Sequence, residues 1–186
     1  MHQIDKEIIR MAAVGDMDAF RQIYKIFSST VYTIAFNITR NRQDAEEATQ
    51  DVFVRVHRKL GDFQFGSSFG TWIYRIAVNT AINMYHNRKN HRQKVSSLDE
   101  IGDAAIPVSN ITKDDLDRKS AESNVRGLLG HLSSEHRSCI VLRELEGLDY
   151  KEMADVLRIP LNTVRSRLKR ARQALIAVGR SLERSI

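Results

Sequence analysis

The sequence has few cysteines to form disulfides, few prolines to interrupt helices and no long apolar run to span a membrane. It contains one cysteine, Cys139, so an internal disulfide is excluded and a reducing compartment is expected. With 2 prolines and few alternating β-branched runs, the 186 residues are expected to fold mainly into helices. No apolar run approaches the ~20 residues of a membrane span, and the chain does not open on a signal-peptide pattern. We therefore expect an all-α, cytoplasmic protein.

Patterns typical of catalytic and metal sites are also missing. The sequence contains no Gly-rich phosphate loop, no Ser-His-Asp set and no quartet of metal ligands. His131 and His136 lie near Cys139, but three candidate ligands without a fourth make a weak zinc site. A half-buried helical cysteine between surface histidines is the simpler interpretation. We therefore expect no enzymatic activity, no cofactor and no metal.

The chain does have an excess of positive charge and a strong helical periodicity. The net charge is +6 and the pI about 9.6, which favours polyanionic partners without choosing between nucleic acid and a membrane surface. Over residues 20–38, apolar side chains recur every three or four positions and form a stripe that needs a partner helix. The length of the chain allows one or two small domains.

Residues 149–172 have the pattern of a helix-turn-helix. Asp149 and Glu152 form a capping box that predicts the start of the first helix. Pro160 is well placed as the first residue of the second helix. Arg158 occupies the turn between them, where a left-handed conformation would cost roughly 1 kcal/mol in a residue other than glycine.

The second helix of this motif is expected to have two unlike faces. Val164, Leu168 and Leu175 fall on one stripe at helical spacing. The other face carries cationic and hydrogen-bonding side chains, namely Arg165, Ser166, Lys169, Arg170 and Arg172. Such a face is typical of helices that enter the major groove of DNA. The alternative is an amphipathic surface helix whose basic residues are only solvated.

A further helix is expected over residues 44–60, with Asp44 and Glu47 as a second capping box and Gly61 at its end. Polar side chains gather on the outer surface near its start: Glu46, Glu47, Gln50 and Asp51. Periodicity alone favours the interpretation that these groups only complement the helix macrodipole.

Residues 62–70, DFQFGSSFG, are too aromatic for an ordinary linker and predict a shaped loop. The helix that follows, from about Thr71, is expected to turn Trp72 inward. Its outward side chains are expected to be Tyr74, Arg75, Asn79 and Asn83, followed by Arg88, Lys89, Arg92 and Lys94. Aromatic and amide groups beside a basic run suit unstacked bases and their phosphates. A surface helix with a basic tail is the alternative.

Periodicity stops over residues 96–113, where turn formers and acidic residues predict a flexible linker. Helix resumes over residues 114–129, and Ser133 can cap another helix that runs to Glu144. The expected organisation is therefore two small helical domains, residues 1–95 and 114–186.

Three stretches resemble, in the same order, the extracytoplasmic-function (ECF) sigma factors of bacterial RNA polymerase, a branch of the sigma-70 family. They are DAEEATQDVFVRVHRKL at 44–60, FGTWIYRIAVNTAIN at 69–83 and LRELEGLDYKEMADVLRIPLNTVRSRLKRAR at 142–172. The resemblance covers essentially the full length. It implies a promoter-recognition subunit with a region 2 helical bundle in the first domain and a region 4 helix-turn-helix in the second.

The resemblance also implies roles for individual residues. Docking on the β′ clamp helices of the polymerase core, in place of the macrodipole interpretation, would involve Asp44, Glu47, Gln50, Asp51, Phe53 and Val54. Capture of flipped minus-10 bases and contact with adjacent phosphates would involve Phe65, Phe69, Trp72, Tyr74, Arg75, Asn79, Asn83, Arg88 and Lys89, with Asn79 the best single candidate. The minus-35 box would be contacted by Arg165, Ser166, Lys169 and Arg170, with Thr163 and Arg172 on phosphates.

The family further implies partners beyond promoter DNA and the β′ subunit. These are the β flap of the polymerase and an anti-sigma factor, with a monomeric free chain, a role in stress response and nucleoid association in the holoenzyme. Arg158 departs from the family's usual glycine. The main alternative is a polymerase-independent helix-turn-helix regulator that dimerises on duplex DNA. It would leave the aromatic and amide surface of the first half unexplained.

Overall fold

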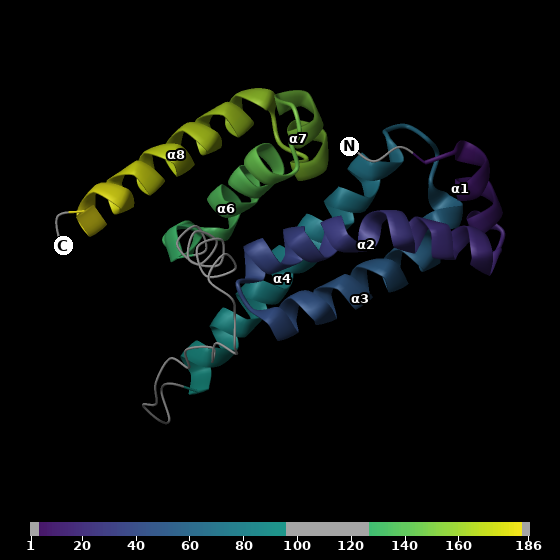
Figure 1. The fold of residues 1–186 in the computed structure, drawn as a ribbon, viewed down its shortest axis with the longest axis horizontal. Coiled ribbons are helices and arrows are strands. Elements are labelled where there is room, and N and C mark those ends of the chain that lie inside the picture. Colours follow the sequence, from purple (N-terminus) through teal and green to yellow (C-terminus); the bar gives the residue numbers. More distant parts are fainter. Residues whose placement is uncertain (1–3, 96–126, 184–186) are drawn as a thin grey trace, which may run out of the picture.

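A computed structural model describes residues 4–95 and 127–183, and all the helices and turns discussed below lie in these two ranges (Figure 1). The regular structure of the described residues is helical throughout, in two helical domains. The predicted linker at 96–113 and most of the helix predicted at 114–129 fall outside these ranges. Among the helices within them, none combines the length and apolarity needed to cross a membrane.

The N-terminal domain is a bundle of three long helices with a short one across its end. Its elements are α1 (Lys6–Ala13), α2 (Met17–Thr39), α3 (Arg42–Lys59), the 3-10 turn η1 (Leu60–Asp62) and α4 (Phe69–Val95). Helices α2, α3 and α4 pack against one another, and α1 packs on α2 (Figure 1). The predicted stripe of α2 lies in the core, where Phe27 and Ile34 are fully buried. Tyr24 is the exception and is half-exposed.

The predicted capping box at the start of α3 was wrong. The helix begins at Arg42, and Asn41 is its N-cap, because the Asn41 side chain accepts a hydrogen bond from the Asp44 backbone N–H at 2.9 Å. Asparagine and aspartate are equally good N-caps, so the earlier residue starts the helix and adds a turn. Asp44 therefore lies inside the first turn of α3.

The C-terminal domain contains the predicted helix-turn-helix. Its described elements are α6 (Ser134–Ile140), the π-helical turn η2 (Val141–Leu145), α7 (Tyr150–Leu157) and α8 (Leu161–Glu183). Both hydrogen bonds of the Asp149 and Glu152 capping box are present, and Ser133 caps α6. Pro160 lies one residue earlier than predicted. It is the N-cap of α8, since its carbonyl accepts from the backbone of Thr163 at 2.8 Å.

The two domains pack against each other through α4 and α7 and through α2 and α6 (Figure 1). One direct contact joins Arg75 on α4 to the backbone carbonyl of Asp155 on α7, at 3.2 Å. The first helix of the helix-turn-helix therefore lies on the helix that was predicted to handle unpaired bases.

Candidate nucleic-acid interface

Helix α8 presents the cationic face that the periodicity predicted. Val164, Leu168 and Ala171 are buried on its inner side, which anchors the helix to the domain core. The predicted side chains on the opposite side are all exposed: Arg165, Ser166, Lys169, Arg170 and Arg172. A helix held by one face and cationic on the other has the form required for reading the major groove. Their contact with DNA stays a prediction.

Neighbouring side chains modify this face. Arg165 donates to Oδ1 of Asn162 at 3.4 Å, so the exposed Asn162 belongs to the same surface, although it was not among the residues predicted for it. Its place three residues before Arg165 was the available signal. Arg172 forms an ion pair with Glu144 at 2.7 Å. The hydrogen bond to Glu144 raises the pKa of Arg172 and partly neutralises its charge in the free protein.

The turn between α7 and α8 has a left-handed residue at Arg158. Arg158 has φ 52° and ψ 46°, and its backbone N–H donates to the carbonyl of Ala154. A side chain at this conformation carries strain of roughly 1 kcal/mol that glycine would avoid. Arg158 therefore adopts the left-handed geometry at a cost in energy.

The loop before α4 is organised by an aromatic cluster. The ring of Phe63 lies 4.9 Å from that of Phe65 and 5.2 Å from those of Phe69 and Trp72, measured between centroids. Phe69 also meets Phe27 of the core edge-on at 5.7 Å and is buried. The expectation that Phe69 is available to bases is not met in this arrangement, because the ring anchors the loop. Phe65 is 38% exposed.

Helix α4 follows the predicted orientation only in part. Asn79, Asn83 and Lys89 are exposed, as expected. The prediction that Tyr74 points outward was wrong, because its side chain is 1% exposed. Burial raises the pKa of the Tyr74 phenol to about 12, with nearby Glu146 adding to the rise and a hydrogen bond to Thr30 opposing it. The sequence could not indicate this, since Tyr74 is covered by elements distant in the chain.

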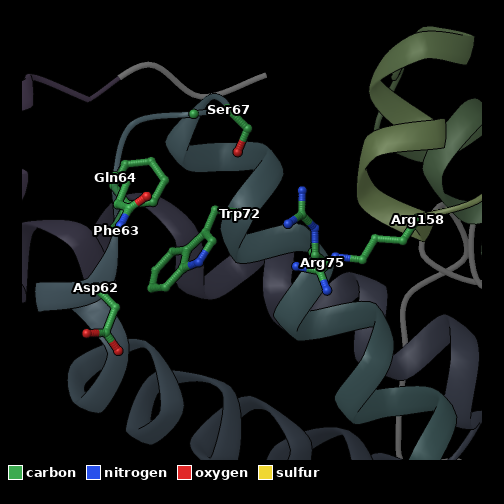
Figure 2. A pocket seen from close by; sticks show the side chains of 8 residues that line it. Asp62, Phe63, Gln64, Ser67, Trp72, Arg75 and Arg158 are labelled. Carbon is green, nitrogen blue, oxygen red and sulfur yellow. The ribbon is translucent and has the colours of Figure 1, made fainter.

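A pocket of about 330 Å³ opens between the aromatic loop, α4 and the turn of the helix-turn-helix (Figure 2). Its lining consists of Asp62, Phe63, Gln64, Gly66, Ser67, Trp72, Arg75 and Arg158. Trp72 was predicted to turn inward but is only partly buried and forms part of the wall. Arg75 and Arg158 lie side by side at one end, and burial together with the charge of Arg158 lowers the pKa of Arg75. The rings of Phe63 and Trp72 in this wall are groups on which an unstacked base can stack.

The outer surface of α3 keeps most of the polar side chains assigned to polymerase docking. Glu47, Gln50 and Asp51 are exposed, and Val54 is 48% exposed.

Two residues assigned to the same surface do not belong to it. Asp44 is buried and forms an ion pair with Arg88 of α4. The same ion pair occupies Arg88, which was predicted to contact phosphates. Phe53 is buried, with its ring 4.6 Å from that of Tyr24. Both side chains hold α3 to its neighbours, so neither is part of the exposed surface of α3.

The region around Cys139 does not resemble a metal centre. In residues 4–95 and 127–183, no three His, Cys, Asp or Glu side chains are grouped closely enough to hold an ion. Cys139 is fully buried and not half-buried as expected. Burial raises the pKa of its thiol to about 11. Its role in the described structure is to fill the core of the C-terminal domain.

Comparison with known families matches both domains. Residues 23–92 match the Sigma-70 region 2 family, and residues 123–175 match Sigma-70, region 4. The chain is 33% identical over 178 residues to the ECF RNA polymerase sigma-E factor of Escherichia coli K12, with 92% of each chain covered.

Two solved structures share the fold. The structure of CnrH in complex with the cytosolic domain of CnrY has a TM-score of 0.70 at 25% identity and covers 95% of this chain and 97% of that one. RpoE of Bartonella quintana in complex with the anti-sigma factor NepR has a TM-score of 0.64 at 23% identity, covering 84% and 93%. Both matches extend over the two domains.

Proposed function

The chain belongs to the ECF branch of the sigma-70 family and is an RNA polymerase sigma factor, and we propose how its two domains divide the recognition of a promoter. The observation that carries the proposal is the contrast between two exposed surfaces. The C-terminal domain offers a cationic helix face, and the N-terminal domain offers exposed amide side chains on α4 together with the partly exposed rings of Phe65 and Trp72. The first surface fits paired DNA and the second fits bases that have left the stack.

The exposed face of α8 contacts the minus-35 box in the major groove. Arg165, Ser166, Lys169 and Arg170 read base edges, while Thr163 and Arg172 contact phosphates. Each good base contact contributes roughly 1–3 kcal/mol of discrimination. Arg172 must exchange its ion pair with Glu144 for a phosphate, which the higher charge density of DNA favours.

The N-terminal domain captures flipped bases of the minus-10 box. Asn79 and Asn83 are exposed on α4 and supply hydrogen bonds to base edges, while the partly exposed Trp72 and Phe65 offer rings for stacking. Unstacking costs a few kcal/mol for each base. One such domain therefore cannot hold a bubble alone, and opening requires the polymerase core.

The remaining partners follow from family membership. Glu47, Gln50, Asp51 and Val54 on α3 dock on the β′ clamp helices, and the C-terminal domain docks on the β flap. The acidic segment at residues 96–113 joins region 2 at 1–95 to region 4 at 114–186. An anti-sigma factor holds the protein inactive, a proposal supported by the likeness to CnrH, whose structure was solved with the cytosolic domain of CnrY. The protein acts in the cytoplasm, on the nucleoid when bound to polymerase, and catalysis belongs to the core enzyme.

Run-off transcription on genomic fragments tests the proposal. Core polymerase supplemented with this chain should start at new positions that share two sequence boxes, and the chain alone should bind duplex DNA weakly. The alternative, a regulator that acts without polymerase, predicts tight binding to a palindrome in a gel shift. Tight binding by the free chain, together with unchanged start sites, would reject the proposed function.

A further inference from the structure

Arg137 on α6 is a buried cation at the junction between the two domains. Its side chain is 1% exposed. Among the residues that the structure describes, it forms no ion pair with a carboxylate. Burying a charge in this way is costly unless hydrogen bonds satisfy its donors. The position of those hydrogen bonds therefore indicates what the arginine holds together.

The guanidinium group bonds to both domains. Within the C-terminal domain, its Nε donates to the carbonyl of Leu129 at 2.9 Å, and its Nη2 donates to the carbonyl of Leu132 at 2.9 Å. Its Nη1 donates to the carbonyl of Ile38 in the last turn of α2, in the N-terminal domain. The guanidinium carbon also lies 4.9 Å from the ring centroid of Tyr85 on α4. One side chain thus connects its own domain to α2 and α4.

The end of α2 needs such a partner. The last four carbonyls of a helix have no bonding partner within it, and positive charge is favourable there. The chain leaves α2 through the left-handed Arg40, and α3 then begins at Arg42. Arginine has five N–H donors spread over a planar fork and can bond to carbonyls that lie apart from one another, whereas the three donors of lysine share one nitrogen atom. Burial lowers the pKa of Arg137, but an arginine in a protein keeps its charge.

Smaller contacts continue along the same junction. His86 Nε2 on α4 lies 3.2 Å from the Ser134 hydroxyl and 3.6 Å from the Glu135 carboxylate, both on α6. At the other end, the Nε of Arg75 donates to the carbonyl of Asp155. Arg137 lies among these contacts as the most completely buried member.

This packing engages side chains that the proposed minus-10 surface uses. Arg75 is bonded to α7, and Tyr74 is buried with Glu146 near its hydroxyl. Arg158 from the C-terminal domain forms one wall of the pocket that contains Trp72 (Figure 2). In the packed form, the N-terminal domain therefore cannot offer its complete surface to unpaired DNA.

We propose that Arg137 is a latch that keeps the two domains packed in the free protein, and that this packed form opens before the first domain binds unpaired bases. The consequence for DNA rests on the proposed function, whereas the latch is a property of the free chain. Removing the latch should raise the ratio of open to packed molecules about tenfold or more, because a charge-assisted hydrogen bond across the junction is lost.

Two variants break the latch from opposite sides. Arg137→Met keeps an unbranched apolar side chain in place of the arginine stem and removes the guanidinium donors. Tyr85→Leu removes the ring from the other domain, so it still tests the latch if Arg137→Met weakens the C-terminal domain. Arg143→Met is the matched control, because Arg143 also donates to a carbonyl, that of Leu148 at 2.7 Å, and lies 5.2 Å from the Tyr150 ring. All of those contacts are within the C-terminal domain.

Two measurements on the full chain report opening. Small-angle X-ray scattering gives the radius of gyration, and acrylamide quenching follows Trp72, the single tryptophan of the sequence. Arg137→Met and Tyr85→Leu should increase both the radius and the quenching constant while circular dichroism shows retained helix. Arg143→Met should match the natural protein. Unchanged scattering and quenching in both folded latch variants would overturn the latch.

Binding to the polymerase core separates the latch from the proposed function. If both hold, Arg137→Met should bind core with a lower apparent Kd, because a larger fraction of the chain is already competent. Opened variants that neither bind core nor direct transcription would support the latch and contradict the proposed function. Normal run-off transcription with unchanged scattering would contradict the latch alone.

Discussion

Helices α8 and α4 were predicted by the same argument, yet the structure agrees with it to different extents. In α8 the buried Val164 and Leu168 and the exposed Arg165 fall on the predicted sides. In α4 the exposed Asn79 agrees, but Tyr74 is buried. Helix α8 is anchored along one face, whereas α4 packs against α2, α3 and α7. Periodicity therefore predicts exposure well only for a helix that is covered on one side.

The two expected capping boxes give a similar comparison. Asp149 and Glu152 form both bonds of a box, whereas Asp44 does not cap α3. The difference lies in the preceding residues. Asn41 competes with Asp44 as a cap, and the three residues before Asp149 include no Ser, Thr, Asp or Asn. A cap can be predicted when the sequence offers one candidate.

The largest expected effect tests the one-sided packing of α8. Leu168→Ala should lower the free energy of unfolding by about 2–5 kcal/mol, because it removes buried methyl groups and leaves a cavity. Lys169→Ala, next to it on the exposed side, should change the free energy of unfolding by less than about 0.5 kcal/mol. Urea denaturation followed by circular dichroism measures both. Equal losses for the two variants would contradict the assigned faces.

The next effect concerns DNA reading by the same helix. Arg165→Ala should cost about 1–3 kcal/mol of holoenzyme binding at particular minus-35 bases. Arg172→Ala should weaken binding evenly across sequences and lower the salt slope by about one. Binding titrations on promoters with single base changes, at several salt concentrations, separate the two. If Arg165→Ala weakened holoenzyme binding equally on all promoter sequences, the assignment of Arg165 to base contacts would be wrong.

A smaller effect is expected from the other domain. Asn79→Ala should reduce promoter opening about tenfold, which corresponds to one lost hydrogen bond of about 1.4 kcal/mol, and should spare closed-complex binding. Asn90→Ala is the matched control, since Asn90 is an exposed amide farther along α4. Permanganate reactivity of the bubble is the measurement. Reactivity that stays unchanged in Asn79→Ala would contradict its role in base capture.

The smallest effect concerns the turn between α7 and α8. Arg158→Gly should raise the free energy of unfolding by up to about 1 kcal/mol, because it relieves the left-handed strain of the folded state. Part of that gain is lost because glycine increases the conformational entropy of the unfolded chain. Gly147→Ala, at φ 68°, should act in the opposite direction. Thermal denaturation compares the two. A destabilised Arg158→Gly would indicate that the arginine side chain contributes more than its backbone costs.

Local sequence determined the parts of this protein that depend on neighbours in the chain. The box at Asp149, the cap at Ser133 and the cationic side of α8 each involve residues within one or two helical turns. Such interactions exist as soon as the helix forms. They were therefore visible in the sequence, and they include the helix-turn-helix itself.

Tertiary structure alone decided which side chains remained available. Asp44 pairs with Arg88, 44 residues away, and Arg137 donates to Ile38, 99 residues away. No periodicity in the sequence relates residues so far apart, because their contact depends on how whole helices pack. The burial of Tyr74 and the position of Arg158 beside the pocket have the same origin. The sequence determined where helices α4 and α8 form, and the packing of the domains decided which of their side chains are exposed.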